Sequence, residues 1–214
     1  MQNYKTILNR AEALMEEKKS KFIATVLPIS EEQQAIDFIN ELKSKYWDAT
    51  HNVYAYSLNN GTLIQRYSDD GEPSGTAGMP VLEVMKRMEI QNAAVVVTRY
   101  FGGTLLGAAG LIRAYSKSAA LGIEASEIIT KKVCTQISVI IEYTLFGRLQ
   151  NMLINNIIIK DTKYEQDVEV TVLADVGTEE QLIEEITDLT NGRAICDVGE
   201  KLYIIIGSDG RLII

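Results

Sequence analysis

The chain has 214 residues and a formal net charge of −8, and its length suits one large domain or two small ones. Residues 1–132 hold 15 Lys+Arg and 15 Asp+Glu, whereas residues 133–214 hold 6 and 14, so the second part carries the whole negative excess. The acidic second part excludes a protein that wraps nucleic acid around its entire surface, but the neutral first part leaves room for a local basic site.

The sequence offers little for metal or redox chemistry. His51 is the only histidine, which excludes a histidine-rich zinc site. Cys134 and Cys196 have neither CxxC spacing nor a nearby histidine, so we expect two reduced thiols. There is no run of 18 apolar residues, and residues 1–10 lack the apolar segment of a signal peptide. We therefore expect a cytoplasmic protein with no membrane contact, no cofactor and no structural metal.

The chain begins with the pattern of a hairpin, a helix and a second hairpin. Extended runs at residues 4–14 and 22–27 flank a lysine cluster that we place at a hairpin tip. Apolar residues follow at helical spacing over residues 35–46, and strands are predicted at 52–58 and 62–67. The lysines of the cluster are Lys18, Lys19 and Lys21. They are explained either by a solvated turn or by contact with phosphate.

Two glycine-rich loops come next, and each leads into a helix. The loop at residues 69–78 precedes a helix expected at 78–88, because Pro80 fits a first turn. The β-branched run at 93–97 predicts a strand buried on both faces, with Arg99 at its end. A second glycine loop then precedes a helix that begins near Gly107 and is expected to end at Gly122.

A strand, a glycine turn and a helix N-terminus together present backbone N–H groups to an anion. We expect the acids of the first loop and the arginines of the second to converge, either as a ligand site or as a structural ion-pair network. His51 lies at the expected start of a strand, and either a structural hydrogen bond or acid–base catalysis would explain it. No catalytic residue and no metal ligand is assigned. The candidate ligand-binding residues are His51, Asp69, Asp70, Glu72, Ser74, Thr76, Arg99, Gly102, Gly103, Gly107 and Arg113.

The acidic second part predicts strands and helices in the order βαββαβ, which is the ferredoxin-like arrangement. We therefore expect two domains, at residues 1–132 and 133–214. The expected strands are 133–143, 157–164, 168–174 and 201–206, and the expected helices are 145–153 and 179–189.

Three segments of the first part closely resemble the signature of the IMPACT/YigZ family: Asp69-Asp70-Gly71-Glu72-Pro73-Ser74-Gly75-Thr76-Ala77-Gly78, Val97-Thr98-Arg99-Tyr100-Phe101-Gly102-Gly103 and Gly110-Leu111-Ile112-Arg113-Ala114-Tyr115. The resemblance covers nearly the whole chain. It implies an α+β fold: an N-terminal domain like the fourth domain of elongation factor G and a small-subunit ribosomal protein, then a ferredoxin-like domain like the fifth domain of that factor. Eukaryotic IMPACT proteins are regulators of translation, which they influence through a protein partner that a bacterial-type member would lack.

The leading functional hypothesis is a non-enzymatic module that binds RNA, the ribosome or a translation factor through its N-terminal domain. One alternative is an enzyme that acts on a phosphorylated small molecule at the loops 69–78 and 99–107. Another is a pure protein-interaction module whose motifs serve only the fold. The sequence favours binding over catalysis because it contains no activated nucleophile and no recognised metal-ligand spacing.

Overall fold

The β-branched run at residues 93–97 forms the centre of a five-stranded antiparallel sheet. The computed structural model describes residues 1–154 and 157–213. The strand β6 (Ala93–Tyr100) pairs with β3 on one side and β4 on the other, in the order β2-β3-β6-β4-β5. The other strands of this sheet are β2 (Ala11–Glu17), β3 (Ser20–Pro28), β4 (His51–Asn59) and β5 (Leu63–Ser68).

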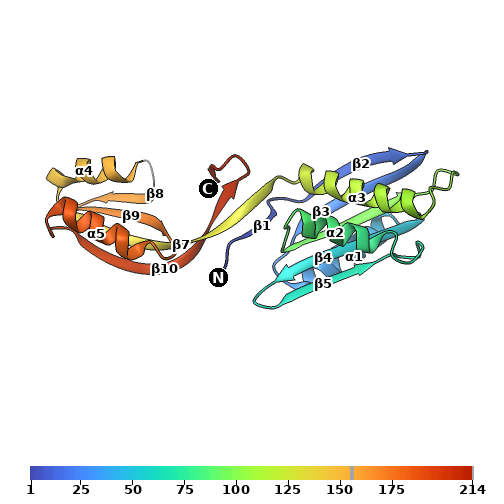
Figure 1. Ribbon diagram of the computed structural model, residues 1–214, viewed down its shortest axis with the longest axis horizontal. Helices are drawn as coiled ribbons and strands as arrows, with labels where there is room; N and C mark the ends of the chain where they lie inside the picture. The colour runs from blue at the N-terminus through green and yellow to red at the C-terminus, as the bar shows by residue number, and fades with distance from the viewer. Residues whose placement is uncertain (155–156, 214) are drawn as a thin grey trace. The chain divides into compact units, whose positions relative to one another are not determined.

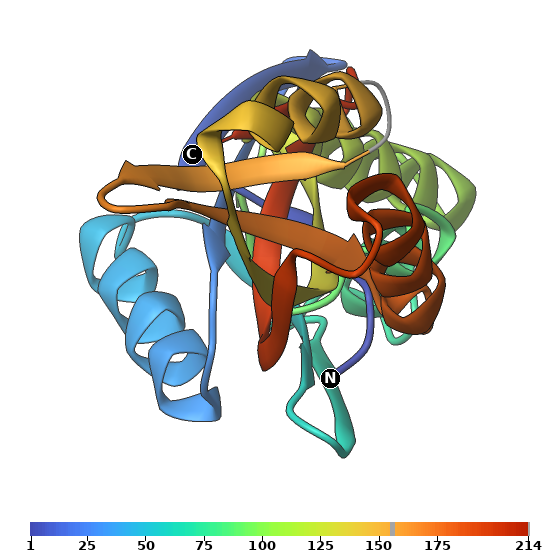
Figure 2. The ribbon, with the colours of Figure 1, turned by 90° about the vertical axis from the view of Figure 1, so that its left-hand side faces the viewer.

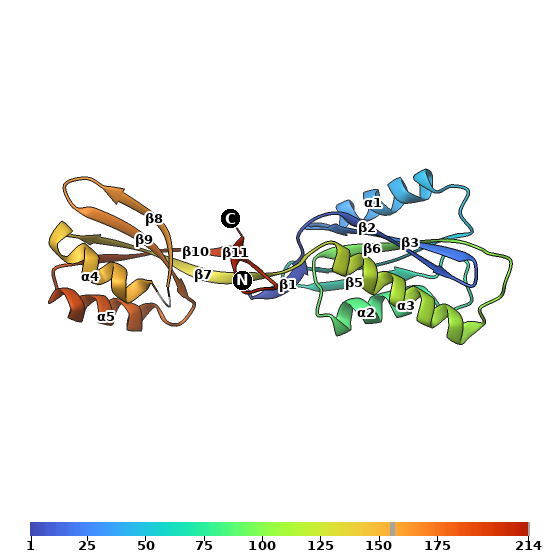
Figure 3. The same cartoon turned by 90° about the horizontal axis from the view of Figure 1, so that it is seen from above.

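Helices cover both faces of this sheet, so its central strand is buried on both sides as predicted. Val95 and Val97 belong to the core under α2 (Gly78–Arg87) and α3 (Ala108–Ala125). Ala94 and Val96 point the other way, into the core under α1 (Glu32–Lys45). Figure 3 shows α1 on one side of the sheet and both other helices on the opposite side. The alternation of side chains along a strand explains why no position of this run can be polar.

Gly122 does not end its helix, contrary to the sequence-based expectation. The helix α3 continues to Ala125. A Cβ atom at Gly122 would lie 2.8 Å from the Ala24 Cβ and 3.2 Å from the Val26 Cγ1. The glycine therefore serves close packing of α3 on β3, a requirement set by tertiary contact and invisible in the helical pattern.

The lysine cluster lies at the hairpin tip where the sequence placed it. Lys18 and Lys19 have φ angles of 46° and 67° and form a two-residue turn between β2 and β3. Two consecutive left-handed residues match the twist of a hairpin. Both side chains are exposed.

The contacts within the fold divide the described chain into two units. The first unit comprises residues 4–131 with 206–213, and the second comprises residues 132–205 with 1–3. The strand β7 (Ile128–Ile141) begins in the first unit, where it pairs with β1 (Tyr4–Ile7), and continues in the second. Figure 1 labels the helices and most of the strands, and Figure 3 also labels β6 and β11.

The second unit has the predicted βαββαβ order, with its strands arranged β10-β7-β9-β8. Leu149 of α4 and Ile186 of α5 pack with the strands in one hydrophobic core. Figure 2 shows both helices beside β8 and β9. No helix within the described residues is long and apolar enough to span a membrane. The remaining elements are α4 (Tyr143–Leu153), β8 (Ile158–Tyr164), β9 (Val168–Asp175), α5 (Glu179–Thr190), β10 (Ile195–Gly207) and β11 (Leu212–Ile213), the last grouped with the first unit.

Candidate functional site

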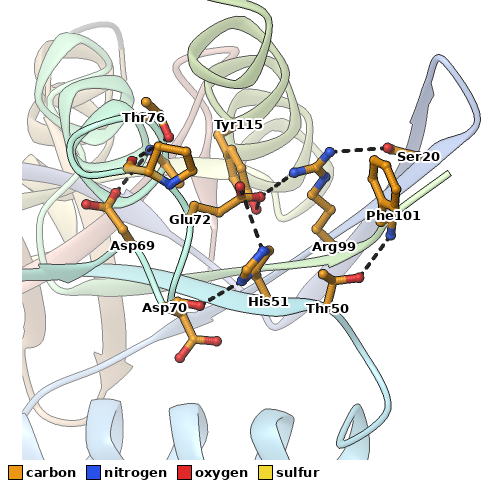
Figure 4. Close-up of polar contacts among 12 residues, drawn as sticks. Ser20, Thr50, His51, Asp69, Asp70, Glu72, Thr76, Arg99, Phe101 and Tyr115 are labelled. Carbon is orange, nitrogen blue, oxygen red and sulfur yellow. Dashed lines mark hydrogen bonds and ion pairs between the residues drawn. The ribbon is translucent and has the colours of Figure 1, made fainter. Parts of the chain in front are cut away.

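Both glycine-rich loops lie at one end of the first unit's sheet, beside the start of β4. The strand pairing places Arg99 opposite Phe22 on one neighbouring strand and opposite His51 on the other. The loop between β5 and α2 supplies Glu72, and α3 supplies Tyr115. Figure 4 shows these side chains pointing toward one another.

Glu72 and Arg99 form an ion pair that is almost entirely shielded from water. The Glu72 Oε1 lies 2.5 Å from the Arg99 Nη1, and the two side chains are only 3% and 6% exposed. The Tyr115 hydroxyl donates a hydrogen bond of 2.7 Å to the same carboxylate oxygen. Burial, together with this carboxylate, raises the pKa of Tyr115 far above its usual value, so the phenol stays protonated and remains a donor.

Arg99 is the next-to-last residue of β6, close to the strand end where the sequence placed it, and its side chain is buried. Its guanidinium carbon is 5.5 Å from the centre of the Phe22 ring and 5.7 Å from that of Phe101. The Nη2 atom donates to the Ser20 Oγ at 3.4 Å. The Nε atom has no hydrogen-bond partner within the part of the chain that the structure describes. The guanidinium thus lies within cation–π distance of two aromatic rings, which attract it.

His51 adjoins the ion pair through its second ring nitrogen. The Nδ1 atom is 2.8 Å from the carbonyl oxygen of Asp70. A carbonyl only accepts, so Nδ1 carries the proton and Nε2 is left as an acceptor when the ring is neutral. This Nε2 atom lies 3.8 Å from the Glu72 Oε2. The acceptor nitrogen of the ring therefore lies beside the carboxylate that Arg99 and Tyr115 engage.

The two aspartates of the first loop make contacts within the protein. The Asp69 carboxylate accepts backbone N–H groups of Gly75, Ala77 and Gly78 at 2.8, 3.1 and 2.8 Å. The Asp70 carboxylate accepts the Asn52 N–H at 2.6 Å and pairs with the Lys43 Nζ at 2.8 Å. Asp69 thereby fixes the loop that enters α2, and Asp70 anchors it to β4.

The other candidate residues are divided between packing and exposed positions. Thr76 is buried, and its hydroxyl donates to the Pro73 carbonyl at 2.6 Å. Ser74 is exposed, as is Gly103. Gly107, with a φ angle of 72°, is the residue that precedes α3. No group of three or more His, Cys, Asp or Glu residues suited to a metal ion occurs among the described residues.

A pocket of about 390 Å³ opens beside the ion pair. His51, Glu72 and Arg99 contribute its polar lining. Its remaining wall is largely apolar and includes Pro73, Phe101, Leu105, Leu106 and Leu111. The sequence-based reasoning missed the apolar residues of this wall. The sequence signal that could have pointed to them is the aromatic Phe101 directly before the glycine pair, which the structure shows to be exposed.

A second pocket, of about 310 Å³, lies between the hairpin tip and α3. Lys18, Arg113 and Lys117 line it together with a single acid, Glu17. Arg113 therefore lies in this pocket, whereas Arg99 lies in the first one. Lys117 was not among the sequence candidates, although it follows Arg113 by one helical turn. Leu106 lines both pockets, so the two are direct neighbours.

Comparisons with known proteins identify the class of this fold. The sequence profile of the Impact N-terminal domain matches residues 18–123, and that of a domain of unknown function matches residues 139–193. A solved structure described as a hypothetical protein superposes with a TM-score of 0.58 at 24% identity, covering 94% of this chain and 98% of its own, and so shares the fold.

Curated relatives make the assignment specific. The IMPACT family member YvyE of Bacillus subtilis is 38% identical over 205 residues, which are 95% of this chain and 94% of YvyE. The Escherichia coli family member YigZ is 37% identical over 100 residues, 46% of this chain and 49% of YigZ. The chain belongs to the IMPACT family, as its motifs predicted.

Proposed function

We propose that this protein is a non-enzymatic, translation-associated factor whose residues 1–132 bind RNA of the translation apparatus. Residues 133–214, a second and acidic domain, would then lie away from the RNA or contact protein. Such a role would place the protein in the cytoplasm. Membership of the IMPACT family, whose eukaryotic members the motif resemblance links to translation, supports the process. The chemistry of the first unit supports the ligand.

One observation carries the proposal: among the described residues, no carboxylate pairs with any of three cations around the second pocket. Within residues 1–154 and 157–213, Lys18, Arg113 and Lys117 form no ion pair. All three side chains are exposed. The pocket has one acid, Glu17, so the three cations leave a local excess of positive charge, although residues 1–132 as a whole are balanced in charge. A focused basic site of this kind attracts phosphate groups.

The enzymatic alternative has weaker support from the same geometry. Asp69 and Asp70, which would have to act on a substrate, accept backbone N–H groups instead. Glu72 is engaged by Arg99 and Tyr115. Among the described residues, the His51 Nε2 accepts no hydrogen bond, and a single acceptor beside a carboxylate that is already engaged does not make an acid–base pair.

The salt dependence of RNA binding tests the proposal. Full-length protein should bind single-stranded RNA. A plot of the logarithm of the binding constant against the logarithm of the salt concentration should have a slope of roughly −2, as expected for about three phosphate contacts. The triple variant Lys18→Gln/Arg113→Gln/Lys117→Gln should lose most of this slope. The matched control is Arg148→Gln/Lys160→Gln/Lys201→Gln, which removes the same charge from the second unit and should bind like the wild type.

Salt-independent binding, or no binding at about 50 mM salt, would contradict the proposal. Loss of binding by the control triple variant would contradict its assignment to the first unit. Sedimentation of the protein with ribosomes from native extract, with and without nuclease, then tests the link to translation. A protein that never sediments with ribosomes would refute that link.

A further inference from the structure

Phe101 is an exposed aromatic residue next to a buried guanidinium. The Arg99 guanidinium carbon lies over the Phe101 ring at 5.7 Å from its centre and at 5.5 Å from the centre of the Phe22 ring. Phe22 is fully buried and Arg99 is 5% exposed, whereas Phe101 is 46% exposed. Phe101 therefore keeps nearly half of its surface open to solvent although Arg99 contacts its ring. An aromatic ring in this position can accept another flat group.

Phe101 and Arg99 are held in place by contacts within the protein before any ligand binds. The Phe101 backbone N–H donates to the Thr50 Oγ1 at 3.0 Å, and Figure 4 shows this contact below the ring. Arg99 is held by Glu72 and by Ser20. Binding to Phe101 therefore costs little ordering of the protein, which favours affinity.

The surroundings of Phe101 match the two chemical parts of a nucleotide. Pro73, Leu105 and Leu111 supply apolar walls next to the ring, and Leu105 is 83% exposed. Leu106 also lines the second pocket, where Lys18, Arg113 and Lys117 lie. A flat apolar platform beside a cluster of cations is the combination by which proteins hold single-stranded nucleic acid, with bases stacked on rings and phosphates in a basic groove.

We infer that the surface from Phe101 to Lys117 binds single-stranded RNA, with one base stacked on Phe101 and the neighbouring phosphates at Lys18, Arg113 and Lys117. This inference rests on the proposed function and names the form of RNA that it requires. A duplex keeps the faces of its internal bases stacked within the helix, so it cannot place one on the Phe101 ring. Stacking tolerates any base, so we expect little sequence preference.

The test compares single-stranded and duplex RNA of one sequence with full-length Phe101 variants. Phe101→Leu retains an apolar side chain but removes the aromatic face, and should weaken single-strand binding about tenfold. Its salt slope should stay that of the wild type, because no phosphate contact is lost. Phe101→Trp should retain the binding. The control is Tyr67→Ala, which removes a ring that is 43% exposed and lines neither pocket, and should leave the affinity unchanged.

The outcomes separate this inference from the proposed function. Unchanged single-strand binding in Phe101→Leu, or duplex binding as tight as single-strand binding, overturns the inference and leaves the proposed function standing. A wild-type protein that binds neither RNA at about 50 mM salt overturns both. A weaker Phe101→Leu variant whose salt slope also falls shows that the loop has moved, and overturns the assignment of stacking to this ring.

Discussion

The buried ion pair of Glu72 and Arg99 is satisfied by groups from several strands and helices. Transfer of each charge from water costs several kcal/mol, so such a pair persists only where further hydrogen bonds complete it. Here Tyr115 donates to Glu72, and Ser20 accepts from Arg99. The pair consequently joins β6, α3, the first glycine loop and the hairpin. Its charge is neutralised internally, so phosphate attraction has to come from other cations.

Arg99→Ala should lower the free energy of unfolding of the first unit by about 3–5 kcal/mol, because it leaves a buried carboxylate without its cation. Urea unfolding monitored by circular dichroism measures the change. The control is the double variant Arg99→Met/Glu72→Gln, which removes both charges and should recover much of the loss. If the free energy of unfolding of the single variant lies within about 1 kcal/mol of the wild-type value, the ion pair does not stabilise the fold to this extent.

At the scale of elements, the second glycine loop packs directly against the β2–β3 hairpin. A Cβ atom at Gly102 would overlap the backbone of Lys19 and Ser20. The Gly102 N–H also donates to the Ser20 Oγ at 3.2 Å. This close approach couples the position of Phe101 to that of Lys18 at the hairpin tip. One backbone contact therefore positions Phe101 and Lys18 of the inferred RNA site relative to each other, whereas Arg113 and Lys117 are carried by α3.

Gly102→Ala should cost about 1–3 kcal/mol of stability, since backbone atoms must move to admit the methyl group. It should also displace the hairpin tip and weaken RNA binding through Lys18. Hydrogen exchange at residues 17–21, measured by mass spectrometry, reports the displacement. The matched control is Gly103→Ala, where nothing lies within 4 Å of the added Cβ and only the φ angle of 79° is strained.

Gly103→Ala should cost about 1–2 kcal/mol through its left-handed backbone without disturbing the hairpin. Faster exchange at residues 17–21 in both variants would mean that general destabilisation of the loop, rather than the Gly102 contact, controls the hairpin tip.

At the scale of the whole molecule, the sequence predicted what depends on local pattern and missed what depends on tertiary contact. The unbroken apolar run around Val95 and Val96 placed the central strand correctly, because burial on both faces excludes polar residues. Gly122 was wrongly read as a helix end, since the atoms that require it belong to β3. The convergence of Glu72 with Arg99 was foreseeable from their loops. The role of Asp69 in holding its own loop was not foreseeable. The sequence looks the same whether a carboxylate accepts backbone N–H groups or binds a ligand.

The two units also have separate hydrophobic cores, which predicts separate responses to core mutations. One core draws on residues between Ile137 and Cys196, whereas the cores around the first unit's sheet draw on residues between Ile7 and Ile128. Leu149 of α4 and Leu42 of α1 are both fully buried, one in each unit. Truncating either leucine to alanine should cost about 2–5 kcal/mol of local stability.

Native-state hydrogen exchange at low denaturant distinguishes the two responses. Leu149→Ala should speed the exchange of amides in α4, β9 and α5 while those of β3, β4 and β6 keep wild-type protection. Leu42→Ala should do the reverse. If each variant instead speeds exchange throughout the chain, the two cores unfold as one cooperative unit. In that case residues 1–132 could not be treated as a binding domain in their own right, and RNA binding would have to be assigned to the whole protein.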